Sequence, residues 1–223
     1  MIAVRLTCLL AIIVVAQTAS PTTRPVSHPF DGDAARKRWN EVFEREEASF
    51  NTKPNVFLVR CLERMPAKGT AIDVAMGQGR NAVVLAKHGF ETTGIDISDV
   101  GIEQAKKLAA GAGVKLATVN ADVFAYDYGK DRWEVVSIIY FNPVRPILDK
   151  FKQAVKPGGC IVIEGFGQRK KGGPPDDSKF ATNELIERFK DWQILEYQDG
   201  DFDADWGGEP KAHVIRLLAR KPG

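Results

Sequence analysis

The residues best suited to chemistry in this chain form one glycine-containing segment, Asp73-Val74-Ala75-Met76-Gly77-Gln78-Gly79-Arg80-Asn81. It lies between a β-type apolar run and a helical run, and strand-to-helix turns of this kind bring small residues close to a ligand. A dinucleotide fingerprint requires glycines where the chain has Ala75, Gly77 and Arg80. No Gly-Lys-Ser/Thr sequence follows, which excludes a P-loop. An acid at the start of the turn therefore favours a cationic ligand over a pyrophosphate.

Two more aspartates follow the next two apolar runs of the chain. Asp96 ends the segment Gly94-Ile95-Asp96, and Asp122 follows the run 115–121. Because ligands of parallel sheets bind at the carboxyl ends of the strands, we expect Asp73, Asp96 and Asp122 at one edge. Asp96 could accept hydrogen bonds from both hydroxyls of a ribose. Aspartate is also common as a helix cap or turn residue, so the ordered set of three carries the signal.

Short β-type runs and helical runs alternate along most of the chain. The predicted strands cover 70–75, 91–97, 115–121, 133–140 and 160–166, with helices over 81–88, 98–110 and 147–155 between them. A helix over 182–190 and strands over 192–197 and 213–220, joined by an acidic loop, follow. Two further helices, one from Asp31 and one reaching Met65, precede the first strand. The pattern predicts an α/β fold, doubly wound around a mostly parallel seven-stranded sheet with a C-terminal antiparallel hairpin.

Length and composition indicate one globular domain. The chain has 223 residues, of which 44% are hydrophobic and 27% charged, and this balance excludes disordered and polytopic membrane classes. Residues 31–223 carry equal numbers of basic and acidic side chains. A nucleic-acid partner is therefore not expected, because binding to phosphates needs a basic surplus.

The cysteines give no sign of a metal site or a disulfide framework. Cys8 lies in an apolar run, and Cys61 and Cys160 are far apart in the sequence. A bridge between Cys61 and Cys160 stays open at this point, although their apolar surroundings favour buried free thiols. No C-x-x-C or zinc-type spacing occurs, so we expect no metal.

Residues 1–20 have the anatomy of a secretory signal, with Arg5, an apolar stretch that ends at Ala16, and small residues. The apolar stretch is short of the roughly 20 residues that a membrane-spanning helix needs. We therefore predict a secreted or periplasmic protein with a signal segment over 1–20, a linker over 21–30 and a domain over 31–223. The alternative is a membrane anchor that leaves the domain facing the cytoplasm, because basic residues such as Arg24 follow the apolar stretch. Membrane contact is expected only through residues 1–20.

Between residues 36 and 222 the chain carries a set of motifs that occur together in one family. They lie at 39–41, 53–58, 73–81, 89–98, 156–159 and 214–222. With Gly77-Gln78-Gly79-Arg80-Asn81 and Gly94-Ile95-Asp96-Ile97-Ser98 at this spacing, the chain resembles the class I S-adenosylmethionine-dependent methyltransferases. The resemblance is closer to the tellurite-resistance and thiopurine methyltransferase-like group. It implies a Rossmann-like fold with S-adenosyl-L-methionine as cofactor.

The resemblance also implies a role for each matching position. The methionine part of the cofactor would lie against Asp73, Ala75, Gly77 and Gly79, the ribose on Asp96, and the adenine beside Ile97, Asp122 and Val123. Tyr140 would also bind the cofactor and Trp39 would be a candidate substrate contact, both of them as neighbours of the methyl-transfer pocket. The chain departs from the family at Ala75-Met76, where Gly-Cys is usual, and the bulky methionine puts the approach of the loop to the cofactor in question.

The segment after the fourth predicted strand, Tyr140-Phe141-Asn142-Pro143-Val144-Arg145, is where an acceptor would lie. Asn-Pro followed by Pro and an aromatic residue suggests amino-group methylation, but Val144 and Arg145 break this pattern. Asn142 and Arg145 are candidate substrate contacts, and a solvated Arg145 is an equal alternative. The basic segment 168–175 is predicted to be a lid over the pocket.

The sequence therefore predicts methyl transfer to a small-molecule acceptor, with a thiol or chalcogen nucleophile as first choice by resemblance. A thiolate needs no base at the moment of transfer, so no catalytic residue is assigned. Two alternatives stay open. One is an NAD-type oxidoreductase, against which Arg80 argues. The other is a non-catalytic cofactor-binding module, suggested by Ala75-Met76 and by a leader that would carry the protein away from the cytoplasmic cofactor pool.

Overall fold

The computed structural model describes residues 31–45, 51–168, 178–206 and 211–223. The predicted signal segment 1–20, the linker 21–30 and residues 169–175 of the predicted lid lie outside these ranges. Among the described residues, no helix has the length and apolar character needed to cross a membrane.

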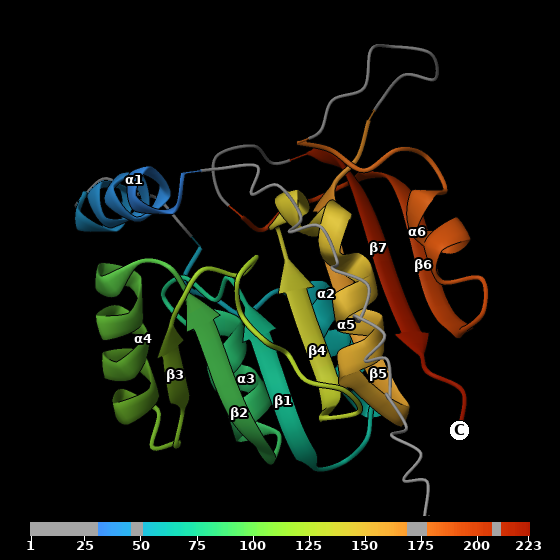
Figure 1. Cartoon of the computed structure of the whole chain (residues 1–223), viewed down its shortest axis with the longest axis horizontal. Helices are drawn as coiled ribbons and strands as arrows, with labels where there is room; N and C mark the ends of the chain where they lie inside the picture. Colours follow the sequence, from blue (N-terminus) through green and yellow to red (C-terminus); the bar gives the residue numbers. More distant parts are fainter. Residues whose placement is uncertain (1–30, 46–50, 169–177, 207–210) are drawn as a thin grey trace, which may run out of the picture.

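A seven-stranded sheet in the order β3-β2-β1-β4-β5-β7-β6 forms the centre of the domain (Figure 1). Its strands are β1 Gly69–Val74, β2 Phe90–Asp96, β3 Ala117–Asn120, β4 Trp133–Ile139, β5 Val155–Phe166, β6 Gln193–Phe202 and β7 Ala212–Arg220. Strands β1 to β5 are parallel, whereas β7 is antiparallel to both β5 and β6. The predicted α/β fold with its C-terminal antiparallel hairpin is confirmed.

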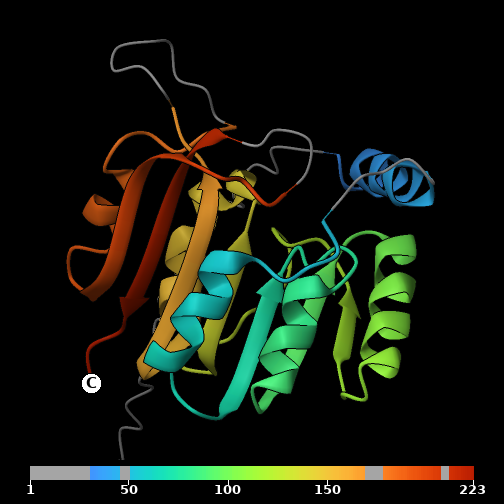
Figure 2. The same ribbon diagram turned by 180° about the vertical axis from the view of Figure 1, so that it is seen from behind.

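Helices cover both faces of the sheet. They are α1 Gly32–Glu44, α2 Val56–Cys61, α3 Arg80–Lys87, α4 Asp99–Gly111, α5 Leu148–Ala154 and α6 Glu184–Arg188, with the short 3-10 helices η1 Leu62–Arg64 and η2 Asn142–Ile147. Figures 1 and 2 show α2 and α3 on one face and α5 on the other, while α4 runs along the β3 edge. Helix α1 sits above the end of α4, at the edge of the sheet where the parallel strands end.

The two faces of the sheet carry separate buried clusters, and β4 contributes to both. Val136 and Ile138 pack into the cluster under α5, while Val135 and Ile139 pack into the cluster under α2. This alternation follows from the two-residue side-chain period of a strand that is buried on both faces. Cys61 and Cys160 both belong to the α2 cluster as free, buried thiols, as their apolar surroundings favoured. Burial raises the pKa of the Cys61 thiol to about 12.

The acidic segment near the end of the chain differs from its prediction. Instead of a loop after residue 197, strand β6 continues to Phe202 and stays paired with β7 along its length. The side chain of His213 on β7 lies between two of the acids, with Nε2 2.8 Å from Asp199 Oδ1 and Nδ1 3.2 Å from Asp201 Oδ1. Because backbone pairing tolerates acidic side chains that find partners, the strand extends further than its apolar pattern indicated.

Candidate functional site

The glycine loop joins β1 to α3 through left-handed backbone. Ala75 has φ 54°, Gly77 φ 54° and Gly79 φ 82°. A side chain at Gly79 would also collide with α4, since a Cβ there would lie 2.6 Å from the Cβ of Ala105. Ala75 holds the same conformation with a Cβ, at a cost of roughly 1–2 kcal/mol. Strained backbone that is retained at a strand end is typical of a functional site.

The side chain of Met76 does not obstruct this loop, because it is buried against β2. It packs with Ala82, Ile102 and Ala105, and a Cβ on Gly94 would lie 1.9 Å from its Sδ atom. Gly94 thus provides the space that Met76 occupies. Met76, where the family usually has Cys, therefore does not block the approach of the loop to a cofactor, because Gly94 on β2 leaves room for its side chain.

The side chain of Asp73, near the end of β1, is buried in the sheet, and only one of its two carboxyl oxygens accepts a hydrogen bond from a described residue. Its Oδ1 accepts a hydrogen bond of 2.9 Å from Ser137 Oγ on β4. Its Oδ2 is buried and has no hydrogen-bond partner among the residues that the structure describes. Burial raises the pKa of Asp73 to about 7, while the Ser137 hydrogen bond, the Arg80 charge and the nearby Ala82 backbone N–H act in the opposite direction. A buried oxygen without a donor is suited to a cationic or hydrogen-bonding ligand.

Asp96 connects the end of β2 to the glycine loop. The Gly77 N–H donates to its Oδ2 at 2.7 Å, and the Ser98 N–H donates to its Oδ1 at 2.8 Å. Burial raises the pKa of Asp96, and these backbone hydrogen bonds lower it. Each carboxylate oxygen keeps a lone pair for a second donor, so the side chain can still accept from a diol.

Asp122 and Val123 follow β3 at the same edge. The Phe124 N–H donates to Asp122 Oδ1 at 2.9 Å, so this aspartate also shapes a turn. Val123 is 4% exposed and packs into the core, whereas Ile97, after β2, is half-buried. The structure thus brings the ends of β1, β2 and β3, with all three aspartates, to one edge of the sheet, in the order that the sequence indicated.

Helix α1 lies on this edge without burying any of its own residues. Ser98 Oγ donates to Asn40 Oδ1 at 2.7 Å, and Arg36 Nη1 donates to Asn120 Oδ1 at 2.6 Å. The Phe43 ring packs on the loop, since a Cβ on Gly77 would lie 3.1 Å from its Cζ atom. Trp39 stacks on Phe43 with ring centroids 5.7 Å apart. Trp39 therefore belongs to a helix that covers the glycine loop.

Tyr140 follows β4, whose end is paired with the end of β1, and it has a left-handed backbone with φ 56°. Its hydroxyl donates to the buried Glu164 and accepts from the Asp205 N–H at 3.1 Å. Burial and the neighbouring carboxylate of Glu164 raise the pKa of Tyr140. The Tyr140 ring lies 5.2 Å from the Phe166 ring, and Trp206 stands edge-on to Phe166 at 6.0 Å. Tyr140 and Phe166 lie at the ends of β4 and β5, and Trp206 packs against Phe166.

Two candidate substrate contacts have structural partners instead. Asn142 is 4% exposed, and its amide donates to the Phe166 carbonyl at 2.6 Å while accepting from the Phe166 N–H at 3.2 Å. Arg145 forms a two-pronged ion pair with Glu184, at 2.9 Å from both Nε and Nη2. Asn142 therefore fixes the end of β5, and Arg145 anchors α6. Their predicted contacts with substrate gain no support from this arrangement.

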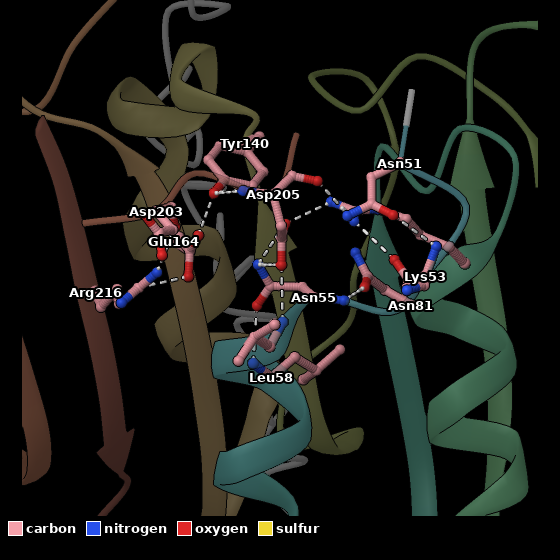
Figure 3. A network of polar contacts seen from close by, with 12 residues as sticks. Asn51, Lys53, Asn55, Leu58, Asn81, Tyr140, Glu164, Asp203, Asp205 and Arg216 are labelled. Atoms are coloured by element: carbon pink, nitrogen blue, oxygen red, sulfur yellow. Dashed lines mark hydrogen bonds and ion pairs between the residues drawn. The ribbon is translucent and has the colours of Figure 1, made fainter. Parts of the chain in front are cut away.

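A buried polar network between the antiparallel hairpin and the glycine loop was not predicted (Figure 3). Its core is the ion pair between Arg216 Nε on β7 and Glu164 Oε2 on β5, at 2.8 Å, with a Glu164 side chain that is 0% exposed. Asp205 and Arg80 form a second pair at 3.0 Å. A signal existed in the sequence for the first pair, because Glu164 interrupts the apolar run 160–166 and Arg216 interrupts the run 213–220.

Comparisons with known proteins agree with this geometry. Residues 71–159 match the family model described as a methyltransferase domain. The chain is 27% identical, over 161 residues, to the probable S-adenosyl-L-methionine-dependent methyltransferase TehB of Haemophilus influenzae, which covers 67% of this chain and 56% of TehB. The chain thus spans about half the length of this curated relative.

Solved structures show the same fold. The crystal structure of TehB from Haemophilus influenzae aligns with a TM-score of 0.62 at 24% identity, over 74% of this chain and 61% of that one. A protein described in the conversion of a disulfide bond into a thioacetal group during echinomycin biosynthesis aligns with a TM-score of 0.65 at 18% identity, over 84% and 92% of the two chains.

The doubly wound sheet, the glycine loop and the acids at the ends of β1 and β2 lie largely within the segment that matches a methyltransferase domain. The chain is similar in sequence to S-adenosyl-L-methionine-dependent methyltransferases such as TehB, and it shares their fold.

Proposed function

We propose that this protein transfers a methyl group from S-adenosylmethionine to a small-molecule acceptor with a thiol, selenol or tellurium nucleophile. The observation that carries the cofactor is the unsatisfied, buried Oδ2 of Asp73 beside a loop with three left-handed residues. A cofactor with a positively charged ammonium and sulfonium fits such a carboxylate, and its close approach fits a loop whose glycines have no room for side chains.

Each part of the cofactor has candidate residues at this edge of the sheet. Asp73, Ala75, Gly77 and Gly79 would hold the methionine part, Asp96 the ribose hydroxyls, and Ile97, Asp122 and Val123 the adenine. Asp96 fits the ribose because its two oxygens, already fixed by the N–H groups of Gly77 and Ser98, cannot rotate away from the site. When bound, the cofactor supplies an electrophilic methyl group on a sulfonium.

The chain itself has to align the acceptor and exclude water. Helix α1 covers the glycine loop through Phe43, and the rings of Tyr140, Phe166 and Trp206 form an aromatic wall on the other side. The Tyr140 hydroxyl donates a hydrogen bond to Glu164, so the orientation of this ring is fixed. Orientation and desolvation suit a soft nucleophile that arrives without a proton to remove.

The acceptor class is supported by similarity alone. The similarity to TehB, at 27% identity over 161 residues, and the resemblance to the tellurite-resistance group are the reasons for favouring a chalcogen nucleophile. No feature of the described residues favours a nicotinamide cofactor, and the position of Arg80, where a dinucleotide fingerprint has glycine, disfavours it.

Calorimetric titration of the full chain with S-adenosylmethionine and with S-adenosylhomocysteine tests the proposal. We expect saturable binding of both, followed by methyl transfer to thiol, selenite or tellurite acceptors in a screen that uses the labelled methyl donor. Absence of binding by both compounds would contradict the proposal and favour a non-catalytic module. Tight binding of a nicotinamide dinucleotide in their place would favour the oxidoreductase alternative.

Cofactor binding is also expected to depend on pH through Asp73. The pKa of Asp73 is raised from 3.8 to about 7. Between pH 3.8 and pH 7, therefore, Asp73 is protonated in the folded, ligand-free protein and ionised in the unfolded chain. Stability of the free protein therefore falls as pH rises through this window. A cationic ligand at Oδ2 lowers the pKa, so binding at pH 6 releases a proton and affinity rises toward pH 7, by at most about tenfold per pH unit.

Titrations in buffers of different ionisation enthalpy measure the released proton directly. Asp73→Asn is the matched control, since it keeps the shape of the side chain and should remove the pH dependence between pH 5 and 7. An equal number of protons exchanged by the wild type and Asp73→Asn would rule out Asp73 as the titrating group.

A further inference from the structure

The segment 203–206, called the strap here, links the antiparallel hairpin to the other side of the site (Figure 3). At its start, the Asp203 carbonyl accepts from Arg216 Nη2 on β7 at 3.3 Å. At its end, the Trp206 carbonyl accepts from the Asn51 N–H at 3.5 Å. Between these points the strap passes the ends of β4 and β5, where it meets Tyr140 and Phe166. It therefore spans the acceptor side of the candidate site.

Asp205 is the central contact of the strap, with a side chain only 14% exposed. Its Oδ1 accepts from Asn55 Nδ2 and from Arg80 Nη2, both at 3.0 Å. Its Oδ2 accepts from the Val56 N–H at 2.8 Å, at the first residue of α2. One carboxylate thus binds the helix that packs on β5 and the helix that follows the glycine loop. Such charge-assisted bonds are stronger than neutral ones and fix geometry.

Arg80 transmits this contact to the cofactor loop. It is the first residue of α3 and follows Gly79 directly. Its Nη1 donates to the Asp205 carbonyl at 3.0 Å and to the Lys53 carbonyl at 2.8 Å, so both terminal nitrogens of the guanidinium have partners. A second link runs parallel to it, since the Asn55 N–H donates to Asn81 Oδ1 at 2.9 Å. The position of the strap and the start of α3 are therefore set together.

The same strap also reaches the aromatic wall. The Asp205 N–H donates to the Tyr140 hydroxyl at 3.1 Å, and Trp206 packs edge-on against Phe166. Displacement of Asp205 would move the partner of Tyr140 and release Arg80 in one step. The acceptor wall and the cofactor loop thus share one polar residue.

We propose that Asp205 is a positioning residue for methyl transfer. It holds the strap against Arg80 and so fixes the aromatic wall of Tyr140, Phe166 and Trp206 in place relative to the glycine loop. The inference rests on the proposed function, because it assumes that the glycine loop binds S-adenosylmethionine. Asp205 acts through Arg80 and need not touch the cofactor. By linkage, a strap that holds the loop in place raises cofactor affinity.

Titration of the full-length protein with S-adenosylhomocysteine, in the wild type and in Asp205→Asn, tests this role. The variant loses the charge and one acceptor oxygen, and we expect roughly tenfold weaker binding, within the range of typical coupling between sites. Asp203→Asn is the matched control, because its exposed side chain leaves the carbonyl contact with Arg216 intact. It should bind like the wild type.

Two further variants separate positioning from a general loss of stability. Arg80→Gln should weaken binding to a similar extent, and Asp205→Asn with Arg80→Gln should add little to either single change, since both break the same link. Asp205→Glu keeps the charge and should recover part of the affinity. Thermal unfolding without ligand, measured in parallel, reports stability, and a common loss of affinity at equal unfolding midpoints supports the proposal.

Additive losses in the double variant, or Asp205→Asn binding like the wild type, would overturn the role of Asp205 while leaving the proposed function intact. If Asp205→Asn does not fold, the comparison of Arg80→Gln with Arg80→Lys decides. Lysine keeps the charge but not the forked geometry, so we expect both variants to bind S-adenosylhomocysteine more weakly than the wild type. Wild-type affinity in Arg80→Gln overturns the inference. Failure of the wild type to bind would instead contradict the proposed function itself.

Discussion

Replacing Asp96 with alanine is expected to weaken binding of S-adenosylmethionine by about 2–4 kcal/mol, the scale of a lost pair of charge-assisted hydrogen bonds. Two effects act in the same direction. The ribose hydroxyls lose their acceptor, and the Gly77 N–H loses the carboxylate that holds the glycine loop at 2.7 Å. Isothermal titration should show Kd rising roughly 30- to 1,000-fold.

Comparison with Asp96→Asn separates these two effects. An amide provides one acceptor oxygen instead of two. It can therefore accept from the Gly77 N–H or from the Ser98 N–H, but it cannot accept from both of these groups and from the two ribose hydroxyls as well. We expect intermediate affinity. The exposed Asp127 provides the control, and Asp127→Ala should bind as the wild type does. Unchanged affinity in Asp96→Ala would remove Asp96 from the ribose role.

The fold, and the placement of three aspartates at one end of the sheet, were predictable because local signals repeat there. Each parallel strand is a short apolar run, and β1, β2 and β3 are each followed or ended by an aspartate. Parallel strands end at one edge, so their order in the sequence is enough to place Asp73, Asp96 and Asp122 together.

The acceptor side was less predictable because its contacts are long-range. Asp205 is 125 positions from Arg80 and 150 from Asn55, and its acidic segment has the composition of a solvated loop. Tyr140 was identified from its position after β4, but its link to Glu164 depends on the pairing of β4 with β5. Arg145 was proposed as a substrate contact for the same reason, because its ion-pair partner Glu184 is 39 positions away and could not be predicted from the local sequence.

The buried ion pair between Glu164 and Arg216 is expected to stabilise the part of the sheet formed by β5, β6 and β7. They face each other across the β5–β7 pairing, where Glu164 is aligned with Arg216. Arg216 is 10% exposed, and it also contacts Gln198 Oε1 at 3.2 Å and stands over the Phe202 ring at 4.8 Å. The pair thus connects β5, β6 and β7 in one buried cluster.

Glu164→Gln is expected to destabilise the protein by about 3 kcal/mol, because it leaves the Arg216 charge buried without a counter-charge. The amide keeps the shape of the side chain, so the loss reports charge and not a cavity. Urea unfolding followed by tryptophan fluorescence measures it as a lower midpoint with an unchanged m-value. Glu103→Gln serves as control, since the 62% exposed Glu103 side chain forms a surface pair with Lys106 that contributes at most about 1 kcal/mol.

A double-mutant cycle with Arg216→Gln distinguishes a coupled pair from two independent residues. Once both charges are removed, no buried charge is left unpaired, so Glu164→Gln with Arg216→Gln should be less destabilised than the sum of the single variants by about 1–3 kcal/mol. Additivity would mean that Arg216 is satisfied without Glu164, by Gln198, the Asp203 carbonyl and the Phe202 ring. In that case Glu164 would serve chiefly to orient the Tyr140 hydroxyl, and Glu164→Gln would affect the acceptor wall more than the fold.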